Sequence, residues 1–226
     1  LMQAMENALR EEDNPRHVAC LLTQVEVDKN DPAFDNPTKP VGPFFSEEEA
    51  KAVQEELGWL MAEDSGRGWR HVVASPIPQH VCDISLVEVL AQRGTIVIAG
   101  GGGGIPVIRG AKGVRHGVSA VVDKDLTSAL IGNILRIETF MILTATPKVA
   151  INFGNPDQQF LDRVTLSEIK ALNAEGHFPP GSMGPKIDAS IRFIEGGGER
   201  VIIADLEQAM DALNGNAGTH IVRDDG

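Results

Sequence analysis

The chain has 226 residues, is 42% hydrophobic and carries a formal net charge of −12 at pH 7. This length and composition allow one substantial core, or a core with a small subdomain. The acidic charge argues against a nucleic acid or an anionic membrane as partner. No run of about eighteen apolar residues and no signal peptide is found, so we expect a cytoplasmic protein without a membrane span.

Two cysteines, Cys20 and Cys82, lie far apart in apolar stretches of the sequence. We therefore expect both to be reduced thiols in the core. The six histidines form no pair at i, i+4 spacing, and the sequence predicts no metal site built from protein ligands.

The first part of the chain predicts helices, a strand and a flap. Apolar residues at helical spacing predict a helix over residues 1–12. Residues 17–27 read as a strand that is apolar at first and alternating afterwards. Residues 31–45 hold four prolines, too many for a central strand or a helix interior, and so predict an ordered loop or small flap. Ser46 begins a capping box, which predicts a helix to about Leu57.

Next comes a segment with two arginines in the string GRGWR. Arg67 and Arg70 can anchor an anion bidentately or hold the acidic flap by salt bridges, and the structural role is favoured. Packing is the expected role of Trp59 and Trp69. Residues 84–91 then have the apolar periodicity of a helix.

Residues 94–130 are the stretch around which the chain is organised. The β-branched run at 95–99 predicts a strand buried on both faces. Glycines occupy positions 100–104, where a backbone without Cβ atoms can bring several N–H groups to one anion. The string Asp-Lys-Asp at 123–125 then opens an apolar helical segment, and anions bind well at a helix start. This order of elements predicts a phosphate site.

The type of phosphate site can be narrowed by elimination. The sequence contains no Gly-x-x-x-x-Gly-Lys-Ser/Thr, and the glycine run lacks the dinucleotide-binding spacing. A flexible loop is the alternative interpretation. It is less favoured because the glycines follow a buried strand and precede a charged helix start.

The remainder alternates between strands and helices. Strands are predicted at 140–144, 201–204 and 220–222, and helices after Thr165, after Pro185 and over 206–213. Thr144 ends a strand, where ligands bind in open parallel sheets, and is a predicted ligand contact. Lys186 lies at a helix start, which is unfavourable for a cation unless an anion is bound. The alternation predicts an α/β fold with a mostly parallel sheet and helices on both faces.

Several strings resemble the carbamate kinases, which belong to the amino acid kinase family. They are DPAFDNPTKPVGPFF (31–45), EDSGRGWRHVVASPIP (63–78), GGGGIPV (101–107), VVDKDL (121–126), VAINFG (149–154), EGHF (175–178), GSMGPK (181–186) and NAGTHI (216–221). The similarity runs along the whole chain in the family's order.

The resemblance implies a three-layer α/β/α sandwich with a mainly parallel sheet and a small protruding subdomain. Residues 1–30 would be the remainder of an amino-terminal lobe for carbamate or carbamoyl phosphate. Residues 31–78 would form the protruding flap and its return, and residues 79–226 the nucleotide-binding lobe. The family's opening strands with their Gly-Gly-Asn and His-Gly-Asn-Gly-Pro loops are not found. We therefore expect these residues to be part of a longer enzyme.

The implied activity is reversible phosphoryl transfer between ATP and carbamate, with ADP and carbamoyl phosphate on the other side. ATP/ADP and Mg²⁺ would be the cofactors, and Mg²⁺ would be held mostly by phosphate oxygens and water. The resemblance assigns catalytic roles to Lys39, Lys124, Asp125 and Lys186. Lys39 would reach in from the flap, Lys124 and Lys186 would bind phosphate groups, and Asp125 would orient the lysines.

The other implied site residues bind the acceptor and the nucleotide. N–H groups of Gly101, Gly102, Gly103 and Gly104 would lie near the acceptor and the phosphoryl group. The nucleotide would contact Thr144, Ser182, Met183, Gly184 and Lys186. The family also implies a homodimer and a place in arginine metabolism.

Two alternatives stay open. Many family members carry an acid after the strand-ending threonine and a tyrosine before the Asn-Phe-Gly stretch, where this chain has Ala145 and Ala150. These differences allow a kinase of another small acid. A non-catalytic nucleotide-binding relic is the second alternative.

Overall fold

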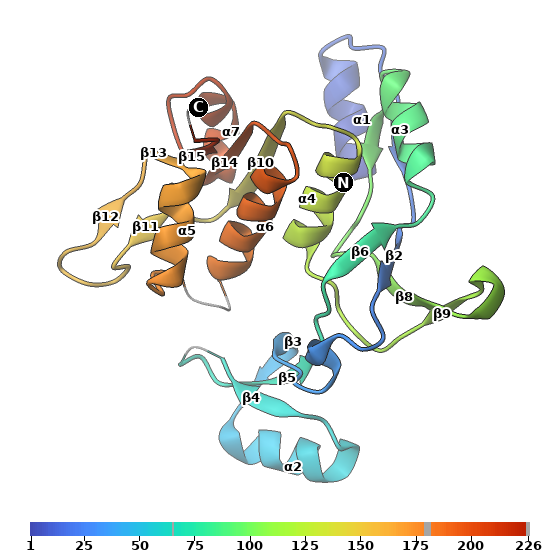
Figure 1. Ribbon diagram of the computed structural model, residues 1–226, viewed down its shortest axis with the longest axis vertical. Coiled ribbons are helices and arrows are strands. Elements are labelled where there is room, and N and C mark those ends of the chain that lie inside the picture. Colours follow the sequence, from blue (N-terminus) through green and yellow to red (C-terminus); the bar gives the residue numbers. More distant parts are fainter. Residues whose placement is uncertain (65, 179–181, 225–226) are drawn as a thin grey trace. The chain divides into compact units, whose positions relative to one another are not determined.

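The computed structural model describes residues 1–64, 66–178 and 182–224 (Figure 1). They form two compact units, Leu1–Thr127 and Ser128–Gly226. Within the described residues, no helix has the length and apolar character needed to cross a membrane.

The first unit contains three sheets. Its elements are α1 (Met2–Glu11), β1 (Val18–Cys20), β2 (Gln24–Val27), η1 (Pro32–Phe34), β3 (Lys39–Phe45), α2 (Glu47–Leu57), β4 (Met61–Glu63), β5 (Trp69–Val73), β6 (Pro78–Val81), α3 (Ile84–Gln92), β7 (Ile96–Ile98), β8 (Ile105–Arg109), η2 (Ala111–Gly113), β9 (Arg115–Gly117) and the start of α4 (Lys124–Ile134). The strand orders are β1-β7, β6-β2-β8-β9 and β3-β5-β4.

The single strand predicted over residues 17–27 is two strands in two different sheets. β1 pairs in parallel with β7, whereas β2 pairs with β6 and β8. Between them the Thr23 hydroxyl donates to the carbonyl of Leu21 at 3.0 Å and accepts from the N–H of Gly100 at 2.8 Å. These side-chain bonds turn the chain from one ladder to the next.

The proline-rich flap contains a strand where the sequence predicted a loop. β3 includes Pro40 and Pro43, and it tolerates them because it is an edge strand that pairs only with β5. The register of this pair shifts between Val41 and Phe45. The predicted capping box at Ser46 is present and begins α2. Residues 39–73 thus form a sheet of their own with one helix, while the three-part domain division stays a prediction.

The two arginines of the flap take the structural role that the sequence favoured. Arg67 and Arg70 contact the buried carboxylate of Asp64 at 2.9 and 3.3 Å. Arg70 also donates twice to the carbonyl of Gly42, at 3.1 and 2.9 Å. Both guanidinium groups lie over the ring of Phe44.

The expectation for the cysteines was correct for one of the two. Both are free, and Cys82 is buried, but Cys20 is exposed. Cys20 ends a three-residue strand in which only Val18 is buried. An apolar run in the sequence does not guarantee burial when the strand lies in a two-stranded sheet.

The second unit contains a four-stranded sheet with helices on both faces. Its elements are β10 (Thr139–Thr144), β11 (Ala150–Ile151), β12 (Gln159–Phe160), β13 (Arg163–Thr165), α5 (Leu166–Ala174), α6 (Gly184–Glu195), β14 (Arg200–Asp205), η3 (Leu206–Gln208), α7 (Ala209–Leu213) and β15 (Thr219–Val222). The order is β10-β14-β15-β13. β10 and β14 are parallel, as are β13 and β15, whereas β14 and β15 are antiparallel.

Strand periodicity shows which helix covers which face of this sheet. Phe193 of α6 packs on Phe140, with ring centroids 5.3 Å apart. On the opposite face, Ala212 of α7 packs with Ile202 and Ala204 of β14. Successive side chains of a strand alternate between faces, so the sheet is the middle of three layers. The α/β class predicted from the sequence is confirmed. The sequence predicted a mostly parallel sheet, and the two four-stranded sheets are mixed, each with both parallel and antiparallel pairs.

Phe193 gives a test of this core. The side chain is fully buried, and a Cβ added at Gly132 or Gly198 would lie 2.7 or 2.1 Å from its ring. We expect Phe193→Ala to lower the free energy of unfolding by about 3–5 kcal/mol, because it leaves a cavity. Phe153→Ala, at a side chain that is 65% exposed, should change it by less than about 0.5 kcal/mol. Urea unfolding followed by circular dichroism measures both, and equal losses would contradict the packing described.

Candidate active site

The glycine loop follows β7 and is held by close backbone packing. The N–H of Gly103 donates to the carbonyl of Gly100 at 2.8 Å. Gly103 has φ +134°, and a Cβ there would lie 1.8 Å from the carbonyl oxygen of Val122. A side chain is therefore excluded at this position by both backbone conformation and space. Gly101 and Gly102 are exposed, and Gly104 is half-buried above Val25.

The start of α4 lies against this loop. The carboxylate of Asp123 accepts from the N–H groups of Asp125 and Leu126 at 2.8 and 3.4 Å, which satisfies donors that a helix start leaves open. The Lys124 ammonium contacts the carboxylate of Asp125 at 2.7 Å. The buried hydroxyl of Thr127 donates to the carbonyl of Gly103 at 2.7 Å. The Thr127 hydrogen bond therefore ties the helix to the loop.

The flap lysine reaches the same place. Lys39 Nζ lies 2.5 Å from Asp123 Oδ2, although 84 positions separate the two residues. Burial alone would raise the pKa of Asp123. The hydrogen bond and charge of Lys39, with the two backbone N–H groups, hold the pKa of this carboxyl below its ordinary value. Among the predicted site residues, the structure thus brings together Lys39, Lys124, Asp125 and the glycines.

Asp123 is the residue of this cluster that the predicted site did not include. Its side chain is only 9% exposed and has a partner in both the flap and the helix start. The acid-lysine-acid string was a usable signal for it. The sequence could not show which of the two acids would face the flap lysine.

A cavity of about 520 Å³ lies beside the glycine loop. Its walls are mainly apolar and include Leu21, Ile98, Ile105 and Val121, together with Gly101, Gly102 and Gly104. Part of the predicted acceptor loop therefore lines a concave space large enough for a small ligand.

In the second unit, Thr144 lies where the sequence predicted a ligand contact. Thr144 and Asp205 are register partners at the carboxyl ends of the parallel strands β10 and β14. They line a cavity of about 480 Å³ together with Leu143, Ala145, Leu206 and Glu207. Carboxyl ends of parallel strands are the usual ligand-binding edge of an open α/β sheet.

The other predicted nucleotide residues lie at the start of α6. The described part of the GSMGPK motif begins at Ser182, because Gly181 lies outside the described residues. Met183 precedes the helix, Gly184 is buried, and Lys186 is half-buried in the first turn. The nucleotide-binding role of these residues stays a prediction.

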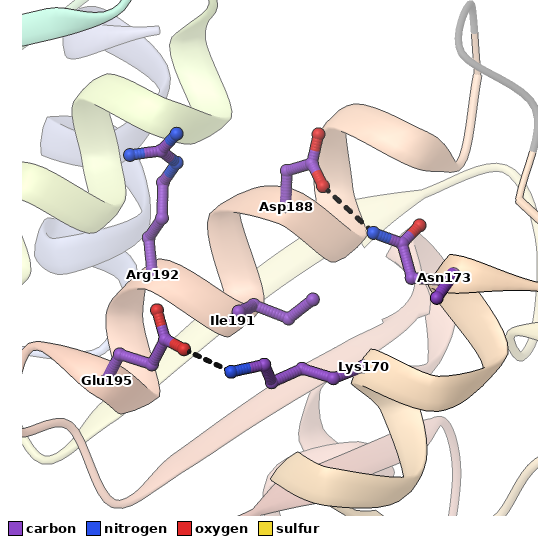
Figure 2. Close-up of a pocket in the computed structure, with 7 residues that line it drawn as sticks. Lys170, Asn173, Asp188, Ile191, Arg192 and Glu195 are labelled. Carbon is purple, nitrogen blue, oxygen red and sulfur yellow. Dashed lines mark hydrogen bonds and ion pairs between the residues drawn. The ribbon is translucent and has the colours of Figure 1, made fainter.

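A third cavity, of about 490 Å³, lies between α5 and α6 and contains none of the predicted site residues (Figure 2). Lys170 pairs with Glu195 at 2.7 Å, and Asn173 donates to Asp188 at 3.2 Å. These polar groups bond to each other across the two helices. In the part of the chain that the structure describes, no group of three or more His, Cys, Asp or Glu side chains could hold a metal ion.

The fold and these clusters are those of a phosphate-handling α/β protein, and comparison with known proteins gives the family. The model of the amino acid kinase family matches residues 51–205. The carbamate kinase of Thermococcus kodakarensis is 50% identical over 222 residues, which are 98% of this chain and 70% of the relative. Carbamate kinase 2 of Staphylococcus aureus strain MRSA252 is 50% identical over 215 residues, 94% of this chain and 68% of the relative. The chain belongs to the amino acid kinase family, in its carbamate kinase branch.

Solved structures agree with this assignment. Carbamate kinase from Giardia lamblia bound to citric acid superposes with a TM-score of 0.92 at 43% identity, covering 99% of this chain and 70% of that one. The same enzyme bound to AMP-PNP superposes with a TM-score of 0.86 at 44% identity, covering 99% and 71%.

The glycine loop offers a matched pair of substitutions. Gly103→Ala should lower the midpoint of thermal unfolding by several degrees, because its Cβ would meet the backbone of Val122. Gly102→Ala, where nothing lies within 4 Å of an added Cβ, should leave the midpoint nearly unchanged. Scanning calorimetry measures both variants. A stable Gly103→Ala variant would mean that the loop does not pack as described.

The ion pair of Asp123 predicts a pH dependence of stability. The pKa of Asp123 is lower in the folded chain, so its ionised form stabilises the fold above the ordinary aspartate pKa of about 3.9. This contribution is lost as the pH falls through the folded pKa. The stability difference between the native chain and Asp123→Asn should therefore be largest at neutral pH and shrink toward pH 3. Urea midpoints across this range measure it, and a constant difference would contradict the assignment.

Proposed function

We propose that the chain is a carbamate kinase-like phosphotransferase, which transfers a phosphoryl group reversibly between ATP and carbamate. The observation that carries this proposal is the cluster of Lys39, Lys124 and Asp125 at the glycine loop. It occurs in a chain that is 50% identical to carbamate kinases over nearly its whole length.

Phosphoryl transfer requires positioning and the cancellation of negative charge more than covalent help from the protein. Lysines and backbone N–H groups do this best when they are fixed before the reaction. Lys124 in the first unit and Lys186 in the second are each assigned to phosphate groups, and Lys39 contributes from the flap. Asp125 orients Lys124, with support from their 2.7 Å contact. Carbamate is already an anion, so the reaction needs no base to activate it.

The nucleotide is assigned to the second unit. Thr144, beside its cavity at the sheet edge, and Ser182, Met183, Gly184 and Lys186 at the start of α6 bind ADP or ATP. Support comes from the Giardia lamblia relative, whose structure was solved with AMP-PNP. When bound, Mg²⁺ supplies additional positive charge to the phosphates, with phosphate oxygens and water as its main ligands. Gly101, Gly102 and Gly104 offer N–H groups to the acceptor and the phosphoryl group. The N–H of Gly103 is already bonded to the carbonyl of Gly100, so the predicted N–H role of Gly103 is replaced by its close packing on Val122.

The resemblance to the carbamate kinases also supports finer proposals. They are that the protein is a homodimer, that it acts in the cytoplasm, and that it serves arginine metabolism. Sedimentation of the purified protein tests the first of these.

The activity is tested by ATP formation from ADP and carbamoyl phosphate with Mg²⁺, measured by luciferase. The reverse reaction with carbamate, acetate and amino acids side by side tests the acceptor. Preference for another acid would replace carbamate as the proposed acceptor. Nucleotide binding without turnover on any acceptor would overturn the proposal in favour of a non-catalytic protein.

Lys124 provides the sharpest test of the catalytic assignment. Lys124→Ala should lower kcat by at least about 100-fold, because it removes a fixed cation from the transferring group. The melting temperature should stay nearly the same, since the side chain is 55% exposed. Lys29→Ala, at an exposed lysine in a turn, is the matched control and should retain full activity. Near-normal turnover of Lys124→Ala would remove Lys124 from the mechanism.

A further inference from the structure

We propose that Asp123 is a positioning residue, which holds the flap lysine Lys39 at the start of α4 and so sets where its charge can act. The inference rests on the proposed function for its kinetic consequence. The structural part of the proposal, that Asp123 holds Lys39 in place, follows from the geometry of the first unit alone.

The backbone brings the two residues together before their side chains meet. Lys39 is the first residue of β3 and is the register partner of Val73 in β5. The next residue, Ala74, is buried and accepts a backbone hydrogen bond from Val121 at 2.9 Å. Val121 lies two positions before Asp123. The base of the flap, at residues 73–74, is therefore held beside the segment that leads into α4.

The carboxylate of Asp123 is fixed independently of the lysine. Its Oδ1 accepts from the N–H groups of Asp125 and Leu126, while its Oδ2 faces Lys39 at 2.5 Å. Two backbone donors on one oxygen leave the other oxygen in a defined place. Asp123 is thus held in place by the helix start, and Lys39, with its side chain 31% exposed, is the more exposed partner of the pair.

The flap strand that carries Lys39 is itself braced. Pro40 follows the lysine directly, and Arg70 holds the carbonyl of Gly42 with two hydrogen bonds while contacting Asp64. A braced strand and a rigid carboxylate leave few positions for the ammonium group. Removing the carboxylate releases Lys39 without changing the strand.

The arrangement places two acid-lysine pairs next to each other at one helix start. Asp123 pairs with Lys39, and Asp125 pairs with Lys124. The two lysines come from different elements, yet each pairs with an acid of the same Asp-Lys-Asp string. Loss of Asp123 should therefore affect the reaction through Lys39, and should have little effect once Lys39 is absent.

The first experiment measures docking of Lys39 without any activity. The chain is acetylated briefly with a limiting reagent, and the labelling of each lysine is read by mass spectrometry. Asp123→Asn keeps an oxygen for the helix N–H groups but loses the charge, and Asp123→Ser is a second variant with a capping oxygen. Both should raise the labelling rate of Lys39 several-fold. Lys51, which pairs with Glu47 on the exposed face of α2, is the internal control and should not change.

The second experiment is a double-mutant cycle on ATP formation. Asp123→Asn should lower kcat/KM for carbamoyl phosphate about tenfold in a chain with Lys39, and less than about twofold in a Lys39→Met background. A residue that only supports the fold would lower activity equally in both backgrounds.

The outcomes separate the two proposals. Unchanged labelling of Lys39 in the folded Asp123 variants, or equal kinetic losses in both backgrounds, overturns the positioning role. A native chain that forms no ATP overturns the proposed function instead, and the labelling experiment then decides the role of Asp123 by itself.

Discussion

The candidate site of the first unit depends on the bonds made by the buried carboxylate of Asp123. A buried charge is tolerated only when it is paired and hydrogen-bonded, and Asp123 has both a lysine and two helix N–H groups. The hydrogen bonds from the two N–H groups hold the start of α4 at this carboxylate, and the ion pair holds the flap lysine Lys39 there as well. One desolvated group thereby couples a helix cap to a distant strand.

Close packing of backbone without side chains sets the loop next to that carboxylate. Gly103 contacts the Val122 carbonyl and Gly104 lies over Val25, so neither position has room for a Cβ. Thr127, one turn into α4, bonds back to the Gly103 carbonyl. The glycines therefore act by allowing close approach as well as by their backbone freedom. The result is a loop whose N–H groups are fixed by the helix that follows it.

In the second unit, the candidate site lies instead at the edge of a parallel strand pair. β10 and β14 run in parallel and end together at Thr144 and Asp205, where a cavity opens. Helix α6 packs on one face of this sheet and α7 on the other. The sheet that forms the core thus also sets the place of this cavity.

The sequence by itself determined what depends on short-range bonds and periodicity. The capping box at Ser46, the helix that begins after Thr165, the glycine loop after a strand and the alternation of strands and helices were all predicted, because each involves residues a few positions apart. The family followed from the same strings. Tertiary structure alone decided the division of residues 17–27 between two sheets, the exposure of Cys20 and the pairing of Lys39 with Asp123. These depend on which distant segments meet, and such pairings leave no local pattern that a single sequence can show.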